Sequence, residues 1–214
     1  MHFQDYIDHT LLVPTATISD IKKLCKEAIQ YGFKAVCVNS CHVVLAKNEL
    51  KGTPVQLATV VGFPLGGMST KAKIFEAREC IANGADEVDM VMNIGWLKSG
   101  LYEQVRDEIF QIKQELGDKT LKVILENCYL SDAEIRKACD LAVSAGADFV
   151  KTSTGFGSGG ATFKDVALMK ETVGNRALIK ASGGIRDRET ALKYIEMGVA
   201  RIGTSSGPKL MEGS

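Results

Sequence analysis

The sequence predicts a single domain, residues 1–214, folded as a (β/α)₈ barrel. Three observations lead to this fold class. Seven glycines recur about every 28 residues, the length of one strand-and-helix unit. An apolar run rich in β-branched residues follows each glycine, as a buried parallel strand requires. Amphipathic patterns of period 3.6 lie between the runs, so strands and helices alternate along the chain.

The predicted strands alternate with glycines at regular positions. One strand precedes the first helix, near residues 6–12. The other seven strands are expected at 35–38, 56–61, 88–92, 122–125, 149–151, 177–180 and 200–203. The glycines are expected at C′, where they end each helix in the left-handed conformation: Gly32, Gly52, Gly84, Gly117, Gly146, Gly174 and Gly198.

The helices are predicted from apolar stripes and from their N-terminal residues. The stripes are clearest over residues 21–29 and 135–143, at spacings i, i+3, i+4, i+7 and i+8. Ser131 and Glu134 form a capping box, and further N-caps are expected at Thr17, Ser69 or Thr70, Thr162 and Asp187. A doubly wound open sheet is the alternative fold. It is weakened by the unit count and by the lack of a GxGxxG turn after the first strand.

Composition narrows the function classes. The formal net charge is zero and 45% of residues are hydrophobic, so we expect neither nucleic acid nor a membrane surface as partner. No signal peptide and no apolar run of ~20 residues is evident. The six cysteines form no CxxC pair, and we expect buried free thiols in a reducing cytosol, hence a cytoplasmic protein. A homo-oligomer, dimer or tetramer, is the expected assembly.

Two lysines, Lys151 and Lys180, lie near the ends of consecutive predicted strands. Neighbouring strands are ~4.8 Å apart, so two inward-pointing amines could approach to ~6 Å. At an effective dielectric of ~20 their charges would repel by roughly 3 kcal/mol. One charged lysine would then help to keep the other neutral, and a neutral amine is a nucleophile toward carbonyls. The alternative is that either lysine points outward, with its stem between the helices.

Acidic residues near the strands are candidate partners. Asp89 lies within a predicted strand, where a carboxylate is costly unless paired. Pairing with Lys151 or Lys180 would place a proton carrier beside the amine, although a purely structural ion pair fits equally well. Asp8 and the pair at 126–127 are weaker candidates of the same kind, while the residues at 86–87 are expected in solvent.

Glycine-rich loops follow the last three strands. Barrels often bind phosphate through backbone N–H groups in the loops after strands seven and eight. The candidates are Gly155, Gly183, Gly184, Gly203, Ser205 and Ser206. Three scattered histidines (His2, His9 and His42) suggest no metal site, and no GxSxG elbow occurs.

These residues together resemble the deoxyribose-phosphate aldolase family. The resemblance rests on Val-Lys-Thr-Ser-Thr-Gly-Phe at 150–156, Ile-Lys-Ala-Ser-Gly-Gly-Ile-Arg at 179–186 and Glu-Val-Asp-Met-Val at 87–91. Shorter matches at 7–12, 36–39 and 203–206 fall in the family order, from about residue 5 to 210.

The resemblance implies a class I aldolase that reversibly cleaves 2-deoxy-D-ribose 5-phosphate to acetaldehyde and D-glyceraldehyde 3-phosphate. It implies a Schiff base on Lys151, with Lys180 as the charged neighbour that lowers its pKa. Asp89 would relay protons through a bound water, and the glycine and serine loops would hold phosphate. No cofactor and no metal are implied.

Two departures from the family pattern bear on these expectations. Phe156 stands where some members carry a phosphate-binding lysine, and the mobile tyrosine tail of longer members is not seen after residues 211–214. Phosphate affinity and proton relay are expected to differ accordingly. The alternatives are a transaldolase-like or sugar-bisphosphate aldolase barrel, and a barrel that only binds a phosphorylated sugar.

Overall fold

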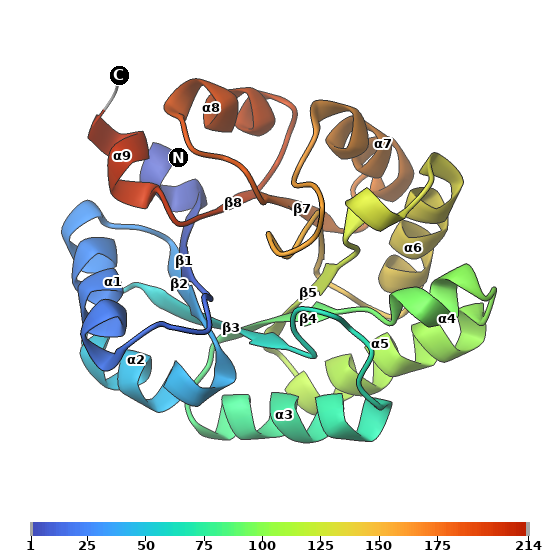
Figure 1. The fold of residues 1–214 in the computed structure, drawn as a ribbon, viewed down its shortest axis with the longest axis horizontal. Coiled ribbons are helices and arrows are strands. Elements are labelled where there is room, and N and C mark those ends of the chain that lie inside the picture. The colour runs from blue at the N-terminus through green and yellow to red at the C-terminus, as the bar shows by residue number, and fades with distance from the viewer. Residues whose placement is uncertain (1, 213–214) are drawn as a thin grey trace.

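A computed structural model describes residues 2–212; Gly213 and Ser214, at the C-terminal end where longer family members carry a tyrosine tail, lie outside the described residues. Within this range eight parallel strands close into a barrel in sequence order (Figure 1). The strands are β1 Ile7–Leu11, β2 Ala35–Val38, β3 Gln56–Val61, β4 Glu87–Val91, β5 Thr120–Ile124, β6 Phe149–Lys151, β7 Leu178–Ser182 and β8 Arg201–Thr204. The predicted barrel is confirmed, and the open sheet is excluded because β8 pairs with β1.

Helices surround the barrel on its outer side (Figure 1). They are α1 Ile18–Tyr31, α2 Val43–Glu49, α3 Thr70–Ala82, α4 Ile94–Lys98, α5 Tyr102–Leu116, α6 Asp132–Ser144, α7 Phe163–Val173, α8 Arg188–Glu196 and α9 Gly207–Glu212. The sequence predicted one helix between consecutive strands, but the connection from β4 to β5 contains two helices, α4 and α5. Gly100, with φ +74°, separates them because its backbone conformation is not helical. Short 3₁₀ turns lie at Phe3–Tyr6, Ser40–His42 and Asn127–Tyr129.

The predicted helix starts are present. The side chains of Thr17, Ser69, Thr162 and Asp187 each accept a backbone N–H of the first helical turn. Ser131 and Glu134 make the reciprocal capping box of α6. The helix ends match less closely. All seven glycines that were expected to end helices have positive φ. Gly117 and Gly174, however, have ψ near −120°, outside the left-handed helical region.

Most of the core lies between the barrel wall and the helices. Side chains such as Ile109 and Ile112 of α5 are fully buried against the strands, each stabilising the fold by about 2 kcal/mol. Four cysteines are buried as expected (Cys25, Cys37, Cys80 and Cys139), whereas Cys41 is exposed and Cys128 partly exposed. These two lie in the 3₁₀ turns at the mouth of the barrel rather than in helices or strands.

The barrel interior divides into an apolar and a charged part. Leu12, Cys37, Ala58 and Val60 form a small apolar cluster on the β1–β3 side. The interior of the other strands contains several buried charged side chains, described below. No helix in the described range is long and apolar enough to cross a bilayer.

Candidate active site

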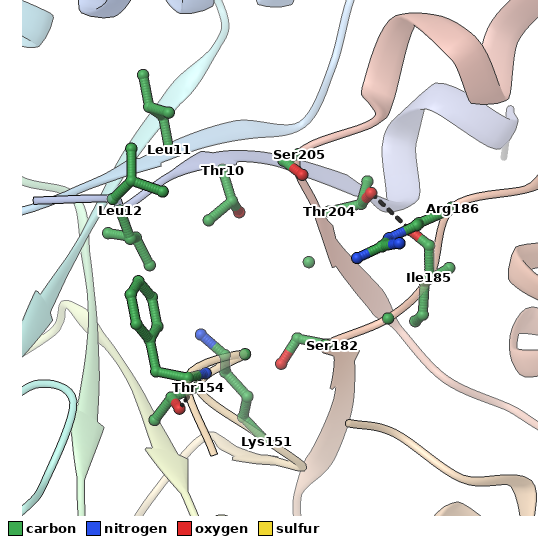
Figure 2. A pocket seen from close by; sticks show the side chains of 16 residues that line it. Thr10, Leu11, Leu12, Lys151, Thr154, Ser182, Ile185, Arg186, Thr204 and Ser205 are labelled. Atoms are coloured by element: carbon green, nitrogen blue, oxygen red, sulfur yellow. Dashed lines mark hydrogen bonds between the residues drawn. The ribbon is translucent and has the colours of Figure 1, made fainter. Parts of the chain in front are cut away.

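A cavity of about 350 Å³ opens at the carboxyl ends of the strands (Figure 2). Lys151 lies at its floor, and glycine-rich loops after β6, β7 and β8 form one side. Six of the predicted site residues line it: Lys151, Gly155, Gly183, Gly184, Gly203 and Ser205. Ser206 lies next to this lining, with its backbone N–H donated to Thr204 Oγ1. The structure therefore gathers the lysine and the loops at one place, as the barrel topology predicts.

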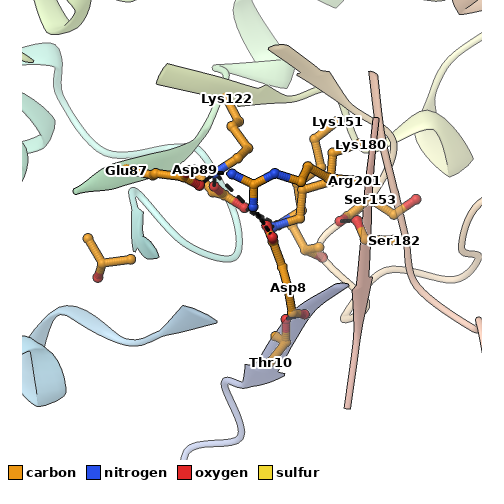
Figure 3. Close-up of polar contacts among 12 residues, drawn as sticks. Asp8, Thr10, Glu87, Asp89, Lys122, Lys151, Ser153, Lys180, Ser182 and Arg201 are labelled. Carbon is orange, nitrogen blue, oxygen red and sulfur yellow. Dashed lines mark hydrogen bonds and ion pairs between the residues drawn. The ribbon is translucent and has the colours of Figure 1, made fainter. Parts of the chain in front are cut away.

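The two strand-end lysines occupy paired positions on neighbouring strands. Lys151 of β6 is in register with Lys180 of β7, and both side chains point into the barrel (Figure 3). Lys151 is 2% exposed and lines the cavity, whereas Lys180 is completely buried and does not line it. The inward orientation is thus confirmed, and only one of the two amines reaches the cavity.

Asp89 joins these lysines. Its Oδ2 accepts a hydrogen bond from Lys151 Nζ at 2.7 Å and from Lys180 Nζ at 2.8 Å. Its Oδ1 accepts a third from Lys122 Nζ at 2.9 Å. Three ammonium groups share one buried carboxylate, and although burial opposes its charge, they hold the pKa of Asp89 well below its usual range.

The lysines respond differently to this environment. Burial, with help from the charge of Lys180, lowers the pKa of Lys151 despite the nearby Asp89. Burial acts on Lys180 as well, but Asp8 and Asp89 together raise its pKa. Lys151 is therefore the amine that is more easily deprotonated, and Lys180 stays charged. The two pKa directions agree with the charges that the family resemblance implies for the pair.

A second group of charges lies deeper in the barrel, and sequence reasoning missed most of it (Figure 3). Arg201 of β8 donates to Asp8 and to Glu87, and Lys122 of β5 donates to Glu87. Glu87 is 2% exposed, so its expected position in solvent was wrong. Strand β4 begins at Glu87, one residue earlier than predicted, and alternation places Glu87 and Asp89 on the same inner face.

Glu126 fixes the loop after β6. It is buried and has φ +56°, and its carboxylate accepts the backbone N–H and the hydroxyl of Thr154. Gly160 in this loop lies directly on the next one, since a Cβ there would be 2.2 Å from the carbonyl oxygen of Gly183. The two loops are thereby packed backbone to backbone. Glu126 was a weak candidate for the reaction and instead supports the cavity wall.

The rim of the cavity has an apolar side and a cationic side. Phe156 lines the cavity and packs edge-on against Phe63, with ring centroids 5.4 Å apart. Arg186 lines the opposite part, where its side chain extends over the cavity (Figure 2). Arg186 was not among the predicted site residues, although the Gly-Gly-Ile-Arg stretch after β7 carried the signal. A guanidinium beside glycine loops suits an anionic ligand.

The arrangement is suited to carbonyl chemistry. A lysine with a lowered pKa faces the cavity, and a carboxylate that stays ionised touches it. Such an amine can add to a carbonyl carbon and form an imine after loss of water. Within residues 2–212, no group of three or more His, Cys, Asp or Glu side chains is placed to hold a metal ion.

Comparison with known proteins gives a consistent result. A family model described as DeoC/LacD family aldolase matches residues 4–210. The deoxyribose-phosphate aldolase of Finegoldia magna is 56% identical over 213 residues, covering 100% of both chains. That of Thermococcus gammatolerans is also 56% identical, covering 100% of this chain and 97% of its own. The tetrameric deoxyribose phosphate aldolase of Aeropyrum pernix superimposes with a TM-score of 0.89 at 33% identity, covering 98% of this chain and 89% of its own.

Proposed function

The chain belongs to the DeoC/LacD family of aldolases, and from this premise we propose that it acts through a Schiff base on Lys151. The proposed reaction is the reversible cleavage of 2-deoxy-D-ribose 5-phosphate to acetaldehyde and D-glyceraldehyde 3-phosphate. One observation carries the proposal: the lysine at the cavity floor shares its Asp89 oxygen with the fully buried Lys180.

The neutral amine of Lys151 attacks the aldehyde carbon of the open-chain sugar, and loss of water gives an iminium. The bond between C2 and C3 then breaks as the C3 hydroxyl gives up its proton, and the electron pair moves into an enamine on Lys151. Protonation of the enamine carbon and hydrolysis of the resulting iminium release acetaldehyde and restore the free amine.

Asp89 is the proposed proton carrier, because its Oδ2 lies 2.7 Å from the reacting nitrogen. A water between Asp89 and the substrate would pass the proton of the C3 hydroxyl. Lys180 does not line the cavity, so we assign it an indirect role. It keeps Asp89 ionised and adds a positive charge beside Lys151.

The phosphate end of the substrate is proposed to lie against the loops after β6, β7 and β8. The backbone at Gly155, Gly183, Gly184, Gly203, Ser205 and Ser206 is the proposed contact surface. Arg186 supplies a positive charge on the same side. Binding energy from this end holds the reacting carbon at Lys151.

Reductive trapping tests the proposal. Borohydride added with acetaldehyde or deoxyribose 5-phosphate is expected to leave a mass increase of one two-carbon unit on the peptide containing Lys151. The Lys151→Ala variant should give no adduct and no detectable cleavage. An unmodified wild-type mass would instead support a barrel that only binds the sugar. An adduct without release of acetaldehyde from deoxyribose 5-phosphate would favour the transaldolase-like or sugar-bisphosphate reading.

We also infer a homo-oligomer and a cytoplasmic location. The tetrameric state of the Aeropyrum pernix relative supports the first. The second is supported by the cysteines, since all six are free thiols in the structure.

A further inference from the structure

The barrel interior contains more charge than the proposed reaction uses. Four cationic and three carboxylate side chains meet there within the described residues, and each is at most 5% exposed. They are Asp8, Glu87, Asp89, Lys122, Lys151, Lys180 and Arg201. Barrel interiors are ordinarily filled by branched apolar side chains. Burying this many charges is costly unless each is paired, so their arrangement requires a reason.

The contacts among these seven groups are unequal. Arg201 donates to Asp8 and Glu87, Lys180 to Asp8 and Asp89, and Lys122 to Glu87 and Asp89. Each of these three cations bridges two carboxylates, and each carboxylate accepts from two of them. The result is a closed ring of six side chains with alternating charge. We call Arg201, Asp8, Lys180, Asp89, Lys122 and Glu87 the charge ring.

Lys151 donates a hydrogen bond to one member of the charge ring, Asp89, but is not itself a member. Among the described residues, its only carboxylate contact is Asp89, which already bridges Lys122 and Lys180. The ring by itself is electrically neutral, so a proton on Lys151 is an uncompensated charge in a buried site. Deprotonating Lys151 leaves the interior neutral, whereas deprotonating a ring lysine would leave two carboxylates short of a partner.

We propose that Glu87 and Arg201 are positioning residues of the aldolase reaction, which complete the charge ring so that Lys151 is the lysine that reacts as the neutral amine. The inference rests on the proposed Schiff-base function. Both residues lie away from the cavity and border a depression at the opposite, amino-terminal end of the barrel. They act through Asp8 and Lys122 and touch no substrate.

The remaining groups that face Lys151 do not upset this balance. Cys37 of β2 is a buried thiol, and burial raises its pKa to about 11, so it is neutral at physiological pH. The interior of β3 contributes Ala58 and Val60. Arg201 cannot give up a proton. Burial opposes the charge on Lys122, but Asp89 and Glu87 raise its pKa above the ordinary value. Lys151 is left as the group that loses its proton.

Three variants test the charge balance: Glu87→Gln, Arg201→Met and the double variant. The rate of reductive trapping with acetaldehyde and cyanoborohydride is measured against pH, and the midpoint of its acid limb reports the amine of Lys151. Glu87→Gln removes a carboxylate, so the midpoint should move to lower pH. Arg201→Met removes a cation, which lets Lys151 keep its proton, so the midpoint should move to higher pH. The double variant should return toward the wild-type midpoint.

At a fixed pH on the acid limb, each single variant should change the trapping rate by about fivefold, in opposite directions. Each single variant leaves every ring group a partner: Lys122 and Arg201 keep Asp89 and Asp8, and the carboxylates keep a lysine. If a single variant is nevertheless unstable, the double variant still tests the proposal, because it removes the pair together.

Shifts in the same direction, or no shift, would overturn the role of Glu87 and Arg201. A double variant that differs from wild type as much as the single variants would do the same. The control is Glu108→Gln, which disturbs a buried ion pair outside the barrel and should leave the midpoint in place. Wild-type protein that forms no adduct at any pH would instead refute the Schiff-base function itself.

Discussion

Two buried lysines in this protein have very different settings. Lys73 of α3 lies outside the barrel wall, where its amine donates to Glu108 Oε2 and to the carbonyl oxygen of Val91, both at 2.8 Å. Lys151 lies inside the barrel and shares Asp89 with two other lysines. Burial lowers the pKa of both amines. A lowered pKa alone therefore does not identify the reactive lysine.

The difference lies in partners and access. Lys73 has a carboxylate of its own, is fully buried, and lines no cavity at the strand ends. Lys151 shares its carboxylate, Asp89, with two other lysines and faces the cavity where a carbonyl can bind. The Lys73–Glu108 ion pair joins α3 to α5, and removing one partner would leave an uncompensated buried charge. An amine left over from a neutral charge ring, at a cavity floor, is available for reaction.

The largest expected effect comes from removing the carboxylate in each setting. Asp89→Asn takes away the proposed proton carrier, so kcat should fall by about 10²–10⁴-fold. Glu108→Gln removes the partner of Lys73 and should cost about 3 kcal/mol of unfolding free energy with kcat unchanged. Steady-state kinetics and urea denaturation measure the two quantities. Equal losses of kcat in both variants would remove the distinction between the settings.

Low pH is expected to change the unfolding free energy differently in the two settings, and this effect is smaller than that of removing a carboxylate. Burial opposes the charge of Asp8, but Lys180 and Arg201 lower its pKa from 3.8 to about 2. The folded state therefore gains stability from Asp8 above pH 3.8 and loses it as the pH falls toward 2. The difference in unfolding free energy between wild type and Asp8→Asn should shrink by about 2 kcal/mol over that interval.

Glu108 should show the opposite sign in the same experiment. Burial raises its pKa despite Lys73, so its ionisation costs stability near neutral pH and the cost is relieved as the pH falls. Urea denaturation of wild type, Asp8→Asn and Glu108→Gln at several pH values measures both. Parallel curves for the two variants would show that both carboxylates have the same kind of partner.

The smallest effect is expected from the neighbouring lysine. Lys180→Leu removes a positive charge beside Lys151, so Lys151 keeps its proton to higher pH and trapping near neutral pH should slow by about tenfold. The acid limb of the trapping profile should move to higher pH. Lys73→Met removes an equally buried lysine and should leave that limb where it is. Movement of the limb in Lys73→Met would mean that general destabilisation, rather than local charge, sets reactivity.

The sequence by itself determined the barrel, the order of its units and the helix caps. Strand hydrophobicity, the helical period and capping residues act over a few neighbours, so they can be read locally. It also determined that Lys151 and Lys180 are paired, because the carboxyl ends of consecutive parallel strands lie side by side. The family resemblance supplied the substrate.

Only the tertiary structure decided which charges meet. The charge ring joins β1, β4, β5, β7 and β8, and its members are up to 193 residues apart in sequence. Glu87 was expected in solvent because the predicted strand began one residue later, at Val88, which left Glu87 in the preceding loop; since β4 begins at Glu87, alternation places it on the inner face with Asp89. Which carboxylate serves which lysine depends on closure of the barrel, since β1 meets β8 only there. That closure leaves Lys151 outside the charge ring and facing the cavity.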